Sequence, residues 1–266
     1  MFIYSKKVII GAALALVMIV SSFTSTNNEN KGYEILKQVH ENLTGYNSYS
    51  VDMTMKLIKN ANKSFERKVR TFSQERDGNG DLQISIFMNP SDVKGTKLLS
   101  HANYDDTDDQ WIFFPALKKV KRIANENKSG PFLGSEIAYE DLGNAWLYKF
   151  NYEYLGEKQY KGENYYLVKS IPKSRYSGYS YVLAYVDKDK MLVDYHEYYD
   201  RRGELLKEEK TAYKYYEQAK CWLPDYVETS NVRNGRKTVL KWTNYQFNKN
   251  ITKEYFQVNQ FQWVKG

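Results

Sequence analysis

The residues that could do chemistry in this chain are scattered, and none forms a recognised catalytic pattern. The three histidines, His40, His101 and His196, lie in unrelated contexts without the HExxH spacing of a zinc site. Gly134-Ser135-Glu136 lacks the preceding glycine of a nucleophile elbow. The single cysteine, Cys221, has no partner signature and is expected to be a small buried hydrophobe. The sequence therefore predicts no catalytic residue, no metal site and no cofactor.

Residues 110–142 favour binding over catalysis. They join an aromatic run, a basic run and a loop with glycines near its ends. The aromatic run is apolar on both strand faces, as expected where protein covers one face and a guest or a lid covers the other. Six residues are candidates for the lining of a ligand cavity or for its lid: Trp111, Phe113, Phe114, Leu117, Phe132 and Leu133. For each of them the alternative is ordinary packing in the core.

A basic cluster follows the aromatic run, and its residues occupy both odd and even positions of the strand. Cations would therefore lie on both faces of the strand and flank the cavity opening. Its members are Lys118, Lys119, Lys121 and Arg122. They predict either a rim that attracts phosphate or carboxylate head groups or a solvated basic surface. Gly130 and Gly134 bracket a short apolar tip, which predicts a mobile lid or membrane-touching loop, with a plain connector as the alternative.

The elements that must position these residues are mostly strands. The chain has 25 Tyr and 5 Pro, and apolar and polar residues alternate along most of it. One such strand is predicted from Tyr49 to Ile58. Turn signals, Gly156 among them, separate about ten or eleven strands, and the short connections favour antiparallel pairing. One amphipathic helix is predicted over residues 31–43. A sheet of this size tends to close or half-close into a barrel, whose interior is either a packed core or a cavity for an apolar guest.

Residues 1–25 have the layout of a secretory signal peptide, because Lys6 and Lys7 precede an apolar run that ends in small residues. An uncleaved anchor is the alternative. Residues 26–266 then form a single exported domain in the periplasm, with membrane association as a further option. The formal net charge of +7 would suit nucleic acid, but an exported chain rarely meets it, so a basic surface or an affinity for anionic lipid is favoured.

The central block resembles the outer-membrane lipoprotein-sorting protein family, whose fold is similar to the lipoprotein carriers LolA and LolB. The resemblance rests on Asp92-Val93-Lys94-Gly95-Thr96, on the run from Gln110 to Ile123, on Gly134-Ser135 and on Tyr139-Glu140-Asp141-Leu142. It implies a mainly β fold: an incomplete antiparallel β-barrel of about eleven strands, with a few helices forming a lid over an apolar cavity for acyl chains. Pro131, Glu136 and Ile137 depart from the family pattern.

Three functions follow as hypotheses. The first is a noncatalytic carrier that binds lipid or lipidated protein and transfers it across the cell envelope. The second is an envelope sensor or adaptor of the same fold that binds a membrane protein complex, and the third is a lipid hydrolase. The expected partners of the carrier are acyl chains and an inner-membrane exporter or other membrane protein, with no nucleic acid, and the expected state is a monomer.

Overall fold

The structure is a computed structural model that describes residues 27–76, 79–104, 107–143, 147–160 and 162–266. The predicted signal segment, residues 1–25, lies outside the described residues. Within those residues no helix has the length and apolar character needed to span a bilayer.

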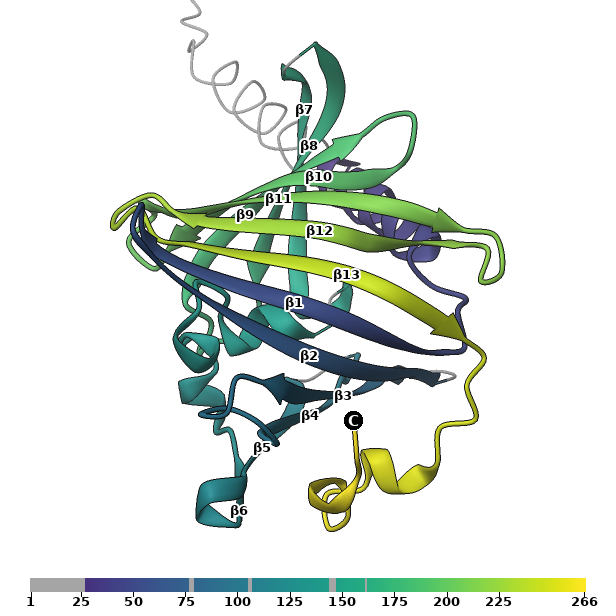
Figure 1. Cartoon of the computed structure of the whole chain (residues 1–266). Coiled ribbons are helices and arrows are strands. Elements are labelled where there is room, and N and C mark those ends of the chain that lie inside the picture. Colours follow the sequence, from purple (N-terminus) through teal and green to yellow (C-terminus); the bar gives the residue numbers. More distant parts are fainter. Residues whose placement is uncertain (1–26, 77–78, 105–106, 144–146, 161) are drawn as a thin grey trace, which may run out of the picture.

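In the described part of the chain, thirteen strands form one antiparallel sheet that curves strongly but leaves two free edges (Figure 1). The strands are β1 (Ser48–Asn60), β2 (Lys63–Arg76), β3 (Asn79–Asn89), β4 (Lys97–His101), β5 (Asp109–Phe114), β6 (Lys119–Arg122), β7 (Phe150–Tyr160), β8 (Glu163–Pro172), β9 (Tyr179–Asp187), β10 (Leu192–Asp200), β11 (Leu205–Tyr216), β12 (Cys221–Asn231) and β13 (Lys237–Phe247).

The sheet is a meander whose first and last strands pair in its middle. Its order is β6-β5-β4-β3-β2-β1-β13-β12-β11-β10-β9-β8-β7, so β6 and β7 are the edges. The pairing of β1 with β13 sets Met55 opposite Leu240 and Leu57 opposite Thr238. The fold is therefore mainly β and half-closed, as predicted.

Two details of the predicted fold are wrong. Thirteen strands replace about eleven, and the described residues contain one α-helix and short 3-10 turns instead of several lid helices. The predicted turn signals missed two turns that have no glycine: Ala61-Asn62, and residues 217–220, where Lys220 has φ of 52°. Gly156 is not a turn, because β7 continues through it with a register shift and a φ of 110°.

The helix over residues 27–42 lies on the inner face of the sheet. Its apolar stripe, Ile35, Leu36 and Val39, packs against side chains of β7 to β10 that include Val168, Ala184 and Val193. Gly32 allows this close approach, since a Cβ there would lie 3.1 Å from the backbone nitrogen of Tyr154. The predicted amphipathic helix is thus confirmed in position and in the stripe that it buries.

The chain between β6 and β7 crosses the inner face of the sheet. This crossing segment, residues 123–143, contains η2 (Asn125–Asn127), η3 (Phe132–Gly134) and η4 (Tyr139–Leu142), and η5 (Leu147–Lys149) follows it. Its buried Ile123, Phe132 and Ile137 form one core cluster with Met55, Val69, Phe87, Leu98, Ile112 and Leu240. The sheet therefore has two inner covers: the helix over β7 to β10, and the crossing segment over the opposite part.

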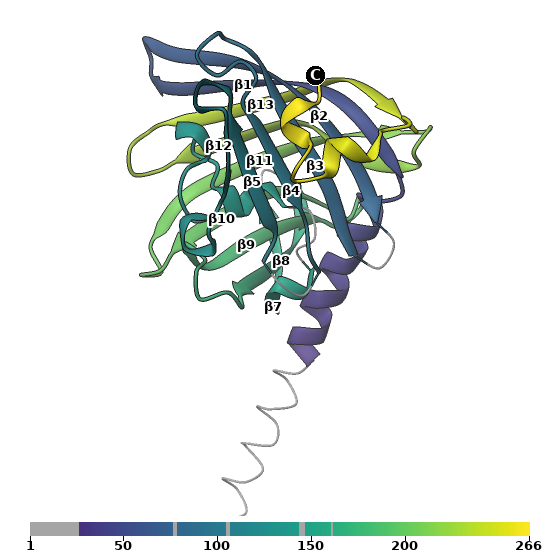
Figure 2. The same ribbon diagram turned by 90° about the horizontal axis from the view of Figure 1, so that it is seen from below.

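The C-terminal segment, residues 249–266, lies on the outer face (Figure 2). It contains η6 (Lys253–Phe256) and η7 (Phe261–Trp263). Phe256 and Phe261 are buried against Ile84, Ile86 and Leu99 of β3 and β4, and Trp111 and Phe113 pack against the same cluster. Strands β3 to β5 are consequently covered on both faces.

Candidate functional site

The inner face of the sheet, the helix and the crossing segment enclose a cavity of about 730 Å³. This volume lies within the range of natural ligand pockets, about 300–1,000 Å³. Part of the wall is apolar, with side chains that include Leu36, Val39, Met53, Met55, Val69, Leu98, Phe132, Val182, Val193, Val227, Leu240 and Trp242. These positions come from the helix, the crossing segment and strands distant in sequence, which the fold brings together.

A polar row crosses β2 to β5 on the same inner face. The strand registers place Ser73 beside Gln83, Gln83 beside Ser100, and Ser100 beside Gln110. The Gln110 side chain, 1% exposed, donates through Nε2 to the Tyr139 carbonyl at 2.9 Å. Its Oε1 and the Ser100 hydroxyl have no hydrogen-bond partner among the described residues. Two buried polar atoms on this wall are thus unsatisfied, which is costly in a protein interior.

A buried ion cluster lies at the start of β5. The Asp108 carboxylate, 9% exposed, pairs with the Lys149 ammonium. The Lys128 ammonium donates to the Asp108 carbonyl and, at 2.6 Å, to Asn125 Oδ1. Gly143 sits against this carboxylate, since any Cβ there would overlap Asp108 Oδ2. Asp108, Lys128 and Lys149 all line the cavity.

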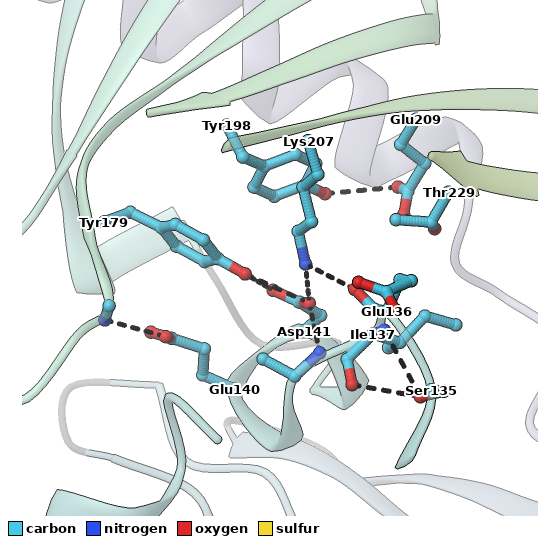
Figure 3. Close-up of polar contacts among 12 residues, drawn as sticks. Ser135, Glu136, Ile137, Glu140, Asp141, Tyr179, Tyr198, Lys207, Glu209 and Thr229 are labelled. Carbon is cyan, nitrogen blue, oxygen red and sulfur yellow. Dashed lines mark hydrogen bonds and ion pairs between the residues drawn. The ribbon is translucent and has the colours of Figure 1, made fainter. Parts of the chain in front are cut away.

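A second buried network joins the crossing segment to β9, β10 and β11 (Figure 3). Lys207 Nζ lies 2.5 Å from Asp141 Oδ2, and both side chains are buried. The ammonium also lies over the rings of Tyr179 and Tyr198, at 5.2 and 4.6 Å from their centroids. Tyr179 donates to Asp141 Oδ1 at 2.9 Å. Burial raises the pKa of both tyrosines well above the ordinary value, so they remain donors.

Glu209 is the second acid of this network. It accepts from Tyr198 at 3.2 Å and from Thr229 at 2.8 Å, and His196 Nδ1 lies 3.6 Å from its Oε1. Burial alone would raise the pKa of Glu209, but the nearby imidazole, Lys207 and the hydroxyl donor hold it below its ordinary value. The carboxylate is therefore ionised, and His196 lies beside it at the cavity wall without a hydrogen bond to its Nδ1 among the described residues.

Glu140 contrasts with its neighbour Asp141. Its Oε1 accepts from the Gly178 backbone N–H at 2.8 Å, and no cation lies within 4 Å of it among the described residues. Burial, followed by the charge of Asp141, raises the pKa of Glu140. It is a partly buried acid of the cavity wall, and within the described part of the chain no cation forms an ion pair with it.

Besides its bonds to Gln110 of β5 and Tyr179 of β9, the crossing segment forms hydrogen bonds with four further strands. Arg67 donates to the Leu133 carbonyl at 2.8 Å, and the Glu136 N–H donates to Thr238 Oγ1 at 2.9 Å. Asn231 donates to Glu136 Oε2 at 2.9 Å, and Lys207 reaches the Glu136 carbonyl at 3.2 Å. These tethers join it to β2, β11, β12 and β13, so it is a fixed wall of the cavity.

The six predicted cavity or lid residues occupy three environments. Phe132, 3% exposed, lines the cavity, and Phe114 and Leu133 pack against its inner cluster. Trp111 and Phe113 lie on the outer face under the C-terminal segment, because alternation along β5 gives the inner face to Gln110, Ile112 and Phe114. Leu117 is 65% exposed in η1 (Pro115–Leu117). The tip around Phe132 therefore points into the protein and not toward a membrane.

The four predicted rim cations lie at the edge of the sheet. Lys119, Lys121 and Arg122 belong to edge strand β6, and Lys118 precedes it with φ of 50°. All four are exposed, and Arg122 pairs with Asp109. In the described part of the chain, the cations that line the cavity are instead Arg76, Lys128 and Lys149.

The networks around Lys207, Glu209 and Gln110 have no signal in the sequence. Lys207 and Glu209 lie on the same face of β11 as Leu205. The other face, with Glu208 and Lys210, is equally polar, so the sequence does not show which face is buried. Across the described residues no group of three or more metal-ligating side chains could hold an ion. Burial raises the pKa of the Cys221 thiol to about 11, which leaves it unreactive at neutral pH.

Comparisons with known proteins place the chain among related folds. A family profile described as “-like: Uncharacterized protein” matches residues 79–263. No curated protein matches the chain significantly. A domain from Vibrio parahaemolyticus described as outer membrane lipoprotein-sorting is 36% identical, with a TM-score of 0.84, and the match covers 88% of this chain and 100% of that one.

Two further crystal structures share the fold. A DUF1329 family protein from Desulfovibrio piger is 26% identical, with a TM-score of 0.78 and coverage of 86% of this chain and 97% of that one. A LolA superfamily protein from Nitrosomonas europaea is 18% identical, with a TM-score of 0.68 and coverage of 85% and 97%. At that identity the last comparison shows a LolA-like fold alone.

Proposed function

Since the chain belongs to the outer-membrane lipoprotein-sorting protein family, we propose that it is an exported, noncatalytic carrier of acyl chains from a lipid or a lipidated protein. The observation that carries the proposal is the cavity of about 730 Å³, whose wall has a large apolar part. Burial of acyl chain there stabilises the loaded form by about 0.8 kcal/mol per CH₂. The carrier works in the periplasm.

The arrangement of the cavity supports binding rather than hydrolysis. His196 and Glu209 resemble the base and acid of a hydrolase, but a nucleophile must reach the base for acyl transfer. In the described residues the hydroxyls that bond Glu209 are those of Tyr198 and Thr229, and both donate to the acid instead of to the imidazole. The network holds the crossing segment in place, which is a structural role.

The transfer step is part of the same proposal. The helix over residues 27–42 packs on the sheet through its apolar stripe, while the crossing segment is also tied to the strands by several side-chain hydrogen bonds. Loading and release therefore pass beside the helix, and a membrane protein partner displaces it at the acceptor membrane. The carrier acts as a monomer and does not bind nucleic acid.

A space-filling substitution tests the proposal. Val227 is half-buried on the cavity wall, so Val227→Trp should fill part of the space that acyl chain occupies. Val232, 44% exposed in the β12–β13 turn, provides the matched control Val232→Trp. Native mass spectrometry of the protein purified without detergent, followed by lipid extraction, should find an acylated guest in wild type and control and much less in Val227→Trp.

Two outcomes would count against the carrier. An empty wild-type protein that copurifies with a membrane complex would favour the sensor or adaptor. Equal guest occupancy in Val227→Trp and Val232→Trp, with both variants folded by circular dichroism, would place the guest outside the cavity.

A further inference from the structure

One buried atom of the cavity wall, Gln110 Oε1, has no hydrogen-bond donor among the described residues. Because Gln110 Nε2 donates to the Tyr139 carbonyl, the amide orientation is fixed and Oε1 is left as an acceptor. Gln110 lines the cavity and is almost fully buried, so no bulk water compensates this oxygen. A ligand that carries N–H or O–H groups would satisfy it.

Glu140 follows directly after Tyr139, the residue whose carbonyl Gln110 contacts, and both Glu140 and Gln110 line the cavity. The Glu140 backbone N–H donates to the Lys128 carbonyl at 2.9 Å. The Glu140 side chain lines the cavity and, among the described residues, has no ion pair. A buried carboxylate without a bound cation attracts a positive charge strongly, because the local dielectric is low.

The charges of the wall add to this preference. Within the described residues the cavity is lined by the carboxylates of Glu75, Asp81, Asp108, Glu140, Asp141 and Glu209, and by the cations Arg76, Lys128 and Lys149. With Lys207, the partner of Asp141, six carboxylates face four cations. The whole chain carries +7, so an acidic cavity is the reverse of its overall composition.

The lining cations are also engaged by the protein itself. Lys149 pairs with Asp108, and Lys128 donates to Asn125. Arg76 donates from Nε to the Gly80 carbonyl at 2.5 Å and from Nη2 to the Ala102 carbonyl. A phosphate or carboxylate head group in the cavity would therefore compete for donors already in use and would meet a net negative field.

We propose that the cavity selects an amphiphile whose polar group is a primary ammonium, bound by the Glu140 carboxylate and Gln110 Oε1, with its acyl chain along the apolar wall. This inference rests on the proposed function and names the ligand chemistry of the same site. The ammonium supplies the donors that Gln110 lacks and the positive charge that Glu140 lacks.

The test compares three ligands with one chain and different heads: decylamine, decanoate and decanol, each below its critical micelle concentration. Isothermal titration calorimetry on the purified full chain at pH 7 measures each affinity. We expect decylamine to bind about tenfold more tightly than decanoate. Glu140→Gln and Gln110→Leu should each weaken decylamine binding about five- to tenfold, and Glu140→Gln should leave decanol binding unchanged because decanol carries no charge. Glu157→Gln, at an exposed position on β7, is the matched control.

The outcomes separate the two levels of the proposal. Equal affinity for the three heads, tighter binding of decanoate, or an amine preference that survives both Glu140→Gln and Gln110→Leu would overturn the ammonium site alone. If none of the three ligands bound, both the carrier function and the ammonium site would be overturned. Because Gln110 lies on β5 and Glu140 lies in η4, and the two substitutions remove different chemical groups, misfolding of one variant leaves the other as a test.

Discussion

The two faces of strands β3, β4 and β5 carry opposite kinds of side chain. The outer face is apolar, with Ile84, Ile86, Leu99, Trp111 and Phe113 packed against Phe256 and Phe261 of the C-terminal segment. At one end the inner face is polar, with Gln83, Ser100 and Gln110. The aromatic side chains of β5 therefore pack against the C-terminal segment. The polar side chains that alternate with them, which a sequence pattern would assign to the solvent-exposed face, lie on the cavity side.

The contrast follows from the layers of the fold. In a sheet with one solvent-exposed face, every second residue of a strand is apolar, and these apolar residues face the protein interior. Here both faces of β3 to β5 are covered, one by residues 249–266 and one by the crossing segment and cavity. Polar side chains on the inner face therefore lower stability unless they form hydrogen bonds. In the proposed site, the ligand supplies the hydrogen bond that Gln110 Oε1 lacks.

Loss of one buried partner on the inner face should have the largest effect on stability. Lys207→Met removes the cation and leaves the Asp141 carboxylate buried without its ion pair. Breaking a buried pair in this way costs about 3–5 kcal/mol. Urea denaturation at pH 7 measures the change in the free energy of unfolding.

The double variant Lys207→Met, Asp141→Leu separates the two costs of that network. If the single variant is destabilised by unpaired charge, the double variant should recover much of the loss. A double variant less stable than Lys207→Met would show that Asp141 contributes chiefly through its bonds to Tyr179 and the Ala138 backbone.

A substitution on the outer face should lower stability without touching the ligand. Trp111→Ala removes a half-buried ring that packs edge-on against His101 at 5.0 Å between centroids. We expect a loss of about 2 kcal/mol, below the range for fully buried aromatic residues. Decylamine affinity, measured by calorimetry, should stay within about twofold of wild type, since the site and Trp111 share no partners.

A large change in ligand affinity in Trp111→Ala would contradict the separation of the two faces. Thermal unfolding with and without ligand provides the control. The ligand should raise the midpoint of wild type and variant by the same increment, because that shift depends on the ligand concentration and dissociation constant.

Much of the fold could be predicted from the sequence. The alternation of Val51, Met55 and Leu57 predicts a half-buried strand, and β1 buries these three side chains. The stripe of Ile35, Leu36 and Val39 predicts the helix. The strand count failed at Ala61-Asn62 and at residues 217–220, two turns without glycine, and at the second of these Lys220 adopts positive φ without the residue type that usually signals it.

The site could not be predicted in the same way. Parity along β5 correctly groups Trp111 with Phe113, but it does not say which layer covers that face, and the covering residues come about 150 positions later, as in the contact between His101 and Phe256. Lys207 and Asp141 are 66 residues apart and meet only because the crossing segment spans the sheet. Such pairings depend on tertiary contacts that have no local pattern.

The smallest effect, and the one that probes the inner face most directly, is a difference in pH dependence between two acids. Burial raises the pKa of Glu140, so its contribution to stability is complete below the ordinary carboxyl value, about 4.3, and is lost as pH rises through the raised folded pKa. Hydrogen bonds from Lys237 and Tyr226 lower the pKa of Glu228. Its neighbours on β12 face inward, Val227 toward the cavity and Thr229 toward Glu209. The contribution of Glu228 is present above the ordinary value and lost as pH falls through the lowered pKa.

The two isosteric variants should therefore move in opposite directions relative to wild type between pH 4 and pH 8. Glu140→Gln should gain relative stability as pH rises, because it no longer holds a buried charge without a cation. Glu228→Gln should lose relative stability over the same interval, because the bonds to Lys237 and Tyr226 no longer involve a carboxylate. Urea denaturation at several pH values gives both curves. If Glu140→Gln instead lost stability as pH rises, Glu140 would already have a counter-ion in the free protein, and an ammonium ligand would have no charge left to neutralise.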